Sequence, residues 1–98
     1  MLVIVFLTKK RLAYAQQSIR SLTKLKTQEK IHFHIADDGS GEDYQTDITI
    51  AVKETLGEGT PVTLSDSHDK GYGANYNAAT LITHNLANAD VILPIEDD

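Results

Sequence analysis

The sequence predicts an α/β fold in which helices cover both faces of a parallel sheet. Short apolar runs rich in Val and Ile alternate along the chain with segments whose apolar residues recur every three or four positions. The first pattern is typical of strands buried on both faces, and the second is typical of amphipathic helices. Strict alternation in the order β-α-β-α-β-α-β predicts right-handed crossovers within one sheet.

The first strand is expected at residues 2–7, a continuous apolar run with the sequence LVIVFL. Thr8 and three basic residues follow this run, as expected where a buried strand ends. A helix is expected next, ending near Thr27, because a stripe of apolar side chains runs along one side of this segment. The stripe consists of Leu12, Ala15, Ile19, Leu22 and Leu25.

The second strand is expected at residues 31–36, where apolar residues first alternate with His and then run on to Ala36. The turn formers of residues 37–41, with the sequence DDGSG, cannot continue a strand. A second helix should follow, with Asp43 as its N-cap and Gly57 as its stop signal. Its apolar stripe is Tyr44, Ile48, Ala51, Val52 and Thr55.

The last part of the chain predicts a strand at residues 62–64, a polar loop at 65–73, a helix at 74–86 and a fourth strand at 91–95. Pro94 cannot donate to a ladder, which confines it to a strand end, a bulge or an edge.

Size and composition bound the possibilities. The 98 residues allow one small domain, residues 1–98, and no linker or repeat divides them. A net charge of −5 argues against a nucleic-acid partner, which normally requires a basic face. The absence of cysteine excludes disulfides and cysteine zinc sites. The longest apolar run is too short to span a bilayer, so a cytoplasmic location is expected.

Acidic residues gather where the predicted strands end. They are Asp37-Asp38, Asp66 and Glu96-Asp97-Asp98. Because parallel sheets bind ligands outside the carboxyl ends of their strands, these positions predict a site. Three adjacent acids repel one another, and a divalent cation is the plainest reason to place them together. The structural alternatives are an Asx-type turn at residues 37–40 and a solvated tail at residues 96–98.

Together, these motifs resemble the N-terminal half of the family 2 glycosyltransferases, along essentially the whole chain. Thr8 and Arg11 match the turn after the family's first strand, and residues 37–40 match its Asp-Asp-Gly-Ser loop. Gly71, Gly73 and Asn77 match the segment that opens its third helix. Residues 92–98 resemble the strand that leads into its Asp-x-Asp motif. Lys9-Lys10, Asp69 and Glu96 stand where the family usually has Tyr-Asn, Asn and Asp.

The resemblance implies a fold and a donor site. The fold is the first half of a GT-A fold: a Rossmann-like three-layer α/β/α arrangement with a four-stranded parallel sheet in the order 3-2-1-4. In that order the fourth strand is an open edge, which could pair with another copy of the chain. The donor is a nucleotide-sugar, with a UDP-sugar favoured, because Asp37 or Asp38 could accept a hydrogen bond from a uracil-like base.

The resemblance also implies a role for each matched residue. Thr8 lines the nucleoside pocket. Glu96 and Asp97 lie near the ribose and sugar, and Asp98 ligates the Mg²⁺ or Mn²⁺ that bridges the diphosphate. Donor-binding roles also carry over to Arg11, Gly71 and Asn77. The acceptor site and the general base belong to the family's second half, so we expect a truncated donor-binding half without catalytic residues of its own and without turnover.

Two other classes stay open. One is a catalytically silent nucleotide- or protein-binding module of the same fold. The other is a receiver-type signalling domain that uses Mg²⁺, but this class needs an acidic pair after the first strand, where the chain has Thr8 and three basic residues. A dinucleotide-binding loop is excluded, because Gly71-Tyr72-Gly73 lacks the third glycine of that motif, position 76 being Tyr.

Overall fold

The computed structural model describes residues 2–24, 30–71, 73, 75, 76 and 91–96, and every structural statement below concerns these residues. Their elements, in chain order, are β1 (Leu2–Thr8), α1 (Leu12–Arg20), the 3-10 helix η1 (Ser21–Lys24), β2 (Ile31–Asp37), α2 (Glu42–Leu56), β3 (Val62–Asp66) and β4 (Val91–Glu96).

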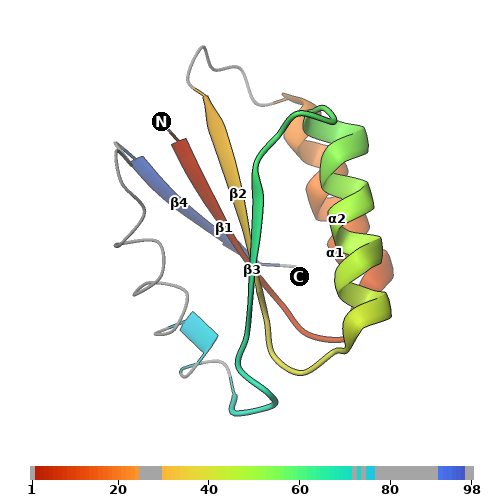
Figure 1. The fold of residues 1–98 in the computed structure, drawn as a ribbon, viewed down its shortest axis with the longest axis vertical. Coiled ribbons are helices and arrows are strands. Elements are labelled where there is room, and N and C mark those ends of the chain that lie inside the picture. The colour runs from red at the N-terminus through yellow and green to blue at the C-terminus, as the bar shows by residue number, and fades with distance from the viewer. Residues whose placement is uncertain (1, 25–29, 72, 74, 77–90, 97–98) are drawn as a thin grey trace.

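The strands pair in parallel in the order β3-β2-β1-β4 (Figure 1). Their last residues lie side by side, since Thr8 is in register with Asp37, and Asp37 with Asp66. Leu7 is in register with Glu96 of β4. The carboxyl ends of the strands therefore form one edge, and the loops that follow β1, β2 and β3 gather there, at the lower end of Figure 1.

The main hydrophobic core lies between the sheet and the two helices (Figure 1). Phe6 and Phe33 pack at its centre, with their ring centroids 5.9 Å apart. The buried members of this core are Leu2, Ile4, Phe6, Ala15, Ile19, Phe33, Ile35, Ile48, Ala51 and Val52. A second, smaller buried cluster lies on the other face of the sheet and consists of Val3, Val5, Leu7 and Ala36.

The predicted three-layer, Rossmann-like architecture is wrong for the described part of the chain. Both α1 and α2 lie on the same face of the sheet, so this part is a small two-layer α/β domain (Figure 1). The reason is the direction of the strand order. From β1 to β2 to β3 the chain steps the same way each time, and two right-handed crossovers in one direction place both helices on one face. The helix expected at residues 74–86 lies mostly outside the described residues.

The first helix is shorter than its apolar stripe predicted. α1 ends at Arg20 instead of near Thr27 and passes into the 3-10 helix η1. Two hydroxyls bond to backbone oxygens three residues earlier, Ser21 Oγ to Ser18 O at 2.6 Å and Thr23 Oγ1 to Arg20 O at 3.0 Å. Hydroxyls that bond to the local backbone compete with α-helical pairing, which accounts for the early end.

The predicted N-cap of the second helix is also wrong. α2 begins at Glu42 with Gly41 as its N-cap, and no side chain caps it. Asp43 lies instead in the first turn, where its charge still complements the helix dipole. No helix in the described ranges is long and apolar enough to span a membrane.

Candidate functional site

Three loops meet at the carboxyl edge of the sheet, and backbone bonds join them beyond the strand ends. The Asp38 N–H donates to Thr8 O at 3.2 Å, and the Ser67 N–H donates to Asp37 O at 2.9 Å. The parallel pairing thus continues one residue past the ends of β2 and β3. It brings Thr8, Asp37, Asp38 and the loop after β3 into one place, although up to 59 positions separate them in the sequence.

Asp38 ties the loop after β3 to the edge of the sheet. Its side chain is buried and accepts two backbone N–H bonds, from Lys70 to Oδ1 and from Gly71 to Oδ2, both at 2.9 Å. Gly71 then opens a helical turn, because its carbonyl accepts the Asn75 N–H at 3.0 Å. The structure therefore places two of the predicted site residues, Asp38 and Gly71, in direct contact.

Asp37 points to the opposite face of the sheet, toward α2, as successive residues of a strand must alternate. The side chain is fully buried, and its Oδ2 accepts the Ser40 N–H at 3.0 Å and the Gln45 side-chain amide at 2.9 Å. The first of these bonds closes the Asx-type turn that the sequence offered as a structural alternative. No donor among the described residues reaches the other carboxylate oxygen, Oδ1.

The buried Gln45 and the half-buried Asp66 complete this cluster; the sequence assigned no role to Gln45 and counted Asp66 only among the acidic strand ends. The Gln45 amide donates to Asp37 Oδ2 and, at 3.0 Å, to Asp66 Oδ2, so one NH₂ group bridges the acids that end two neighbouring strands. Asp66 Oδ1 accepts the N–H groups of His68 and Gly39, at 2.7 and 3.0 Å. The His68 N–H lowers the pKa of Asp66, with the Gln45 amide acting in the same direction.

Thr8 is buried and shares a hydrogen bond with the Tyr44 hydroxyl of α2. The same hydroxyl receives the Arg11 N–H at 3.2 Å. Arg11 is thus linked to the site through its backbone, while its side chain is exposed. Tyr44, which the sequence assigned only to a helix face, fixes the start of α1 against α2.

An ion pair between Lys9 and Asp69 spans two of the three loops. Lys9 Nζ also lies 3.9 Å from Asp38 Oδ2. The hydrogen bond with Asp69 raises the pKa of Lys9, and the same bond lowers the pKa of Asp69. Both members of the pair are exposed, with 47% of the Lys9 side chain and 64% of the Asp69 side chain accessible to solvent.

A buried amide lies two positions before the asparagine that the sequence selected. Asn75 donates to the Ala36 carbonyl at 2.8 Å and accepts the Ser67 hydroxyl at 2.9 Å. It thereby joins the helical turn after Gly71 to β2 and to the end of β3. The predicted residue, Asn77, lies outside the described residues, as do Asp97 and Asp98, and Glu96 is described only as the last backbone position of β4.

The described carboxylates do not form a metal site. Asp37, Asp38 and Asp66 accept N–H donors, and within the described ranges no group of three acidic or His side chains could hold an ion. The predicted ligand, Asp98, is not among them.

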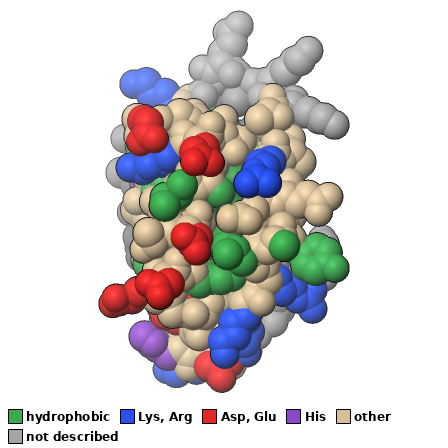
Figure 2. Space-filling model, turned by 90° about the vertical axis from the view of Figure 1, so that its right-hand side faces the viewer, with side chains coloured by type: hydrophobic (Ala, Val, Ile, Leu, Met, Phe, Trp, Pro, Cys, Tyr) green, Lys and Arg blue, Asp and Glu red, His purple; other side chains and the backbone are tan. Residues whose placement is uncertain are grey.

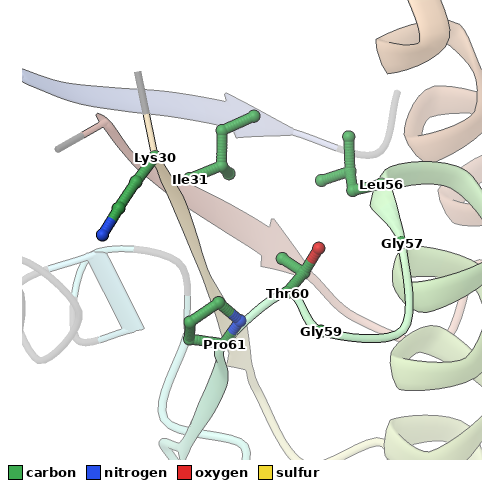
Figure 3. A pocket seen from close by; sticks show the side chains of 7 residues that line it. All are labelled: Lys30, Ile31, Leu56, Gly57, Gly59, Thr60 and Pro61. Atoms are coloured by element: carbon green, nitrogen blue, oxygen red, sulfur yellow. The ribbon is translucent and has the colours of Figure 1, made fainter. Parts of the chain in front are cut away.

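Two other features lie away from this edge. A hollow of about 510 Å³ opens at the amino ends of β2 and β3 (Figure 3), and among its described lining residues Lys30 alone is charged. The outer face of α1 and α2 carries interspersed acidic and basic side chains (Figure 2). Neither feature contains a predicted site residue.

A polar array lies on the sheet face opposite the helices. His34 is fully buried and contacts the hydroxyls of Thr63 and Ser65, through Nδ1 at 2.7 Å and Nε2 at 2.9 Å. His32 Nε2 lies 2.9 Å from the same Thr63 hydroxyl. Burial lowers the pKa of His34 to about 4, with the neighbouring His32 adding to the effect. Both imidazoles have hydroxyl partners, so this array is accounted for by packing within the sheet.

Comparison with known proteins adds no family: no protein-family model matches the chain, and a search of the curated proteins found no match. The resemblance to family 2 glycosyltransferases therefore stays a prediction from the motifs.

Proposed function

We propose that the carboxyl edge of the sheet binds a nucleotide-sugar, with a UDP-sugar favoured, and that the chain carries the donor-binding part of a glycosyltransferase. One observation carries the proposal. Residues matched in three separate segments meet at this edge, because Asp38 bonds through its backbone to Thr8 and through its carboxylate to Gly71. A donor pocket at the carboxyl ends of parallel strands requires this convergence.

Asp38 is the proposed contact for the base. Each of its oxygens accepts one backbone N–H, and a carboxylate oxygen has two acceptor positions, so an edge of the carboxylate can still receive the imide N–H of uracil. Asp37 faces α2 and serves the Asx-type turn, which leaves Asp38 as the member of the pair that faces the loop after β3.

Asp98 would hold the Mg²⁺ or Mn²⁺ of the donor complex. The ion would neutralise the diphosphate as the bond to the sugar breaks. The chain's own residues would bind and orient the donor: Thr8 and Asp38 at the nucleoside, and Glu96 and Asp97 near the ribose and sugar.

Isothermal titration calorimetry tests the proposal with the 98-residue chain, UDP and Mn²⁺. We expect UDP to bind in the presence of Mn²⁺, and Asp98→Asn to abolish the dependence on the metal. Glu58→Gln removes the same charge at the turn before β3, at the opposite edge of the sheet, and should leave binding unchanged. A folded chain whose affinity for UDP is insensitive to Mn²⁺ and to Asp98→Asn would contradict the proposal.

A catalytically silent module is the second candidate, and the hydrogen bonds of the acids favour it. Asp37, Asp38 and Asp66 each hold loops in place, so selection for folding alone could keep all three. If this module binds a protein, the same titration should show no heat of UDP binding.

A further inference from the structure

The backbone of β3 has one side that no described strand covers. β3 lies at the end of the strand order, and among the described strands it pairs with β2 alone. Toward β2, the Pro61 carbonyl accepts the Phe33 N–H at 2.9 Å. Because alternate residues of a strand turn their backbone groups to opposite sides, every second residue after Pro61 also faces β2. The backbone groups that point outward belong to the residues between them: Val62, Leu64 and Asp66.

The polar side chains of β3 already have partners. The Thr63 and Ser65 hydroxyls contact the His34 ring at 2.7 and 2.9 Å. Asp66, the only charged residue of the strand, accepts the Gln45 amide at 3.0 Å. β3 also lacks the Lys or Pro with which many natural edge strands prevent pairing. A strand that approaches this edge therefore meets open backbone groups and, on β3 itself, no unbonded charge.

Leu64 lies at the centre of this edge and is 47% exposed. It is in register with Ile35, which is fully buried in the core beneath the helices. Residues in register share a face of a parallel sheet, so the Leu64 side chain lies at the margin of the helix-covered face, where the sheet stops. A further strand beside β3 would extend that face and cover part of the exposed leucine, which favours pairing.

We propose that two copies of the chain pair through β3, antiparallel, across a two-fold axis beside Leu64. In this register Leu64 lies opposite Leu64 of the second copy, and Val62 of each copy lies opposite Asp66 of the other. Every outward residue then faces an outward residue, and each such pair exchanges two hydrogen bonds, about six in total. The two exposed leucines meet at the axis.

Self-pairing accounts for this edge without a second kind of chain. An unrelated strand would have to bring its own apolar side chain to Leu64, whereas the two-fold axis supplies Leu64 itself and closes the assembly. Three outward residues a side are far fewer than the roughly 20–30 of a stable interface, so the dimer should exchange with the monomer. The pairing uses the backbone of β3 and no donor ligand, so it does not depend on the proposed function.

Sedimentation velocity on the 98-residue chain, from about 10 µM to about 1 mM, tests the pairing, because a contact of this size dissociates within that range. We expect the mean mass to rise with concentration from that of one chain toward that of two. Leu64→Lys sets two like charges opposite each other and should weaken the dimer about tenfold. Ile50→Lys, at a residue of α2 that is 49% exposed, makes the same change away from the edge and should leave the dimer intact.

Cross-linking tests the register, since the chain has no cysteine of its own. Residues opposite each other in a hydrogen-bonded pair have Cα atoms about 5.5 Å apart, within reach of a disulfide, so Leu64→Cys should form a covalent dimer on mild oxidation. The two copies of Val62→Cys would lie about 14 Å apart and should not.

Three results would overturn the pairing. They are a natural chain that stays monomeric throughout the concentration range, association that Leu64→Lys leaves unchanged, and equal cross-linking of Leu64→Cys and Val62→Cys. The first would assign the edge to another protein or to solvent. If Leu64→Lys fails to fold by circular dichroism, the comparison of the two cysteine variants decides the question.

Discussion

Acidification from pH 7 to pH 5 should destabilise the chain through His34. The imidazole is buried between two hydroxyls, and its pKa of about 4 lies below its ordinary value of 6.5. The unfolded chain therefore takes up a proton that the folded chain excludes. The stabilisation is complete above the ordinary pKa and is lost as the pH falls from about 6.5 toward 4.

The two pKa values set the magnitude. Between pH 7 and pH 5, the preferential protonation of the unfolded chain at His34 lowers the free energy of unfolding by about 2 kcal/mol. Small domains are stable by about 5–15 kcal/mol in total, so the loss is a sizeable part. The other lowered carboxyl pKa values, those of Asp66 and Asp69, act below about pH 4 and fall outside this window.

Urea unfolding followed by circular dichroism at pH 7, 6 and 5 measures the effect. His34→Gln keeps hydrogen-bonding groups but cannot titrate, so most of the pH dependence should be lost, and the remainder should come from His32, whose pKa burial also lowers. His32→Gln is the matched control, because His32 is only partly buried and should leave most of the pH dependence in place. Equal slopes for the natural chain and His34→Gln would refute the reasoning, as would an NMR titration of the His34 ring near pH 6.5.

Two substitutions test the contacts that hold the site together, each by urea unfolding. Gly39→Ala should cost more than about 1 kcal/mol, because a left-handed φ and a Cβ 2.9 Å from the Asp69 backbone both oppose it; Gly59→Ala, in open space, should be nearly neutral, and equal effects would contradict the close approach. Gln45→Leu should cost about 1–3 kcal/mol, because it removes the amide donor shared by the buried Asp37 Oδ2 and the half-buried Asp66 Oδ2. Gln17→Leu on the exposed face of α1 is its control, and a neutral Gln45→Leu would show that the bridge does not contribute.

The strands were predictable because their signal is local. A continuous run of Val, Ile, Leu and Phe identified β1, and apolar residues alternating with His identified β2, each to within one residue. The three-layer expectation came from the alternation of strands and helices, which does not say which face each helix covers. That face depends on the direction in which the strands are added, and the expected order 3-2-1-4 steps one way from the first strand to the third, which puts both described helices on one face.

The contact of the Gln45 amide with Asp37 and Asp66 shows what the sequence alone misses. The predicted apolar stripe of the second helix starts at Tyr44 and does not include Gln45. In the structure Gln45 shares the buried face with Ile48 and Val52. Gln45 lies three and seven positions before the apolar residues Ile48 and Val52, and this spacing could have placed it on the buried face. Its partners, Asp37 and Asp66, follow only from the pairing of β2 with β3.

The alternation of side chains along a strand divides the Asp-Asp pair between two tasks. Asp37 faces α2, and its carboxylate accepts the Ser40 N–H of the turn and the side-chain amide of Gln45. Asp38 faces the loop after β3, where it accepts the N–H groups of Lys70 and Gly71, and Lys9 Nζ lies 3.9 Å from its Oδ2. These contacts hold a loop, so they fit both a donor site and a silent protein-binding fold. Calorimetric titration with UDP and Mn²⁺ is therefore the measurement on which the two candidate functions differ most directly, since a donor site predicts heat of UDP binding and a protein-binding fold predicts none.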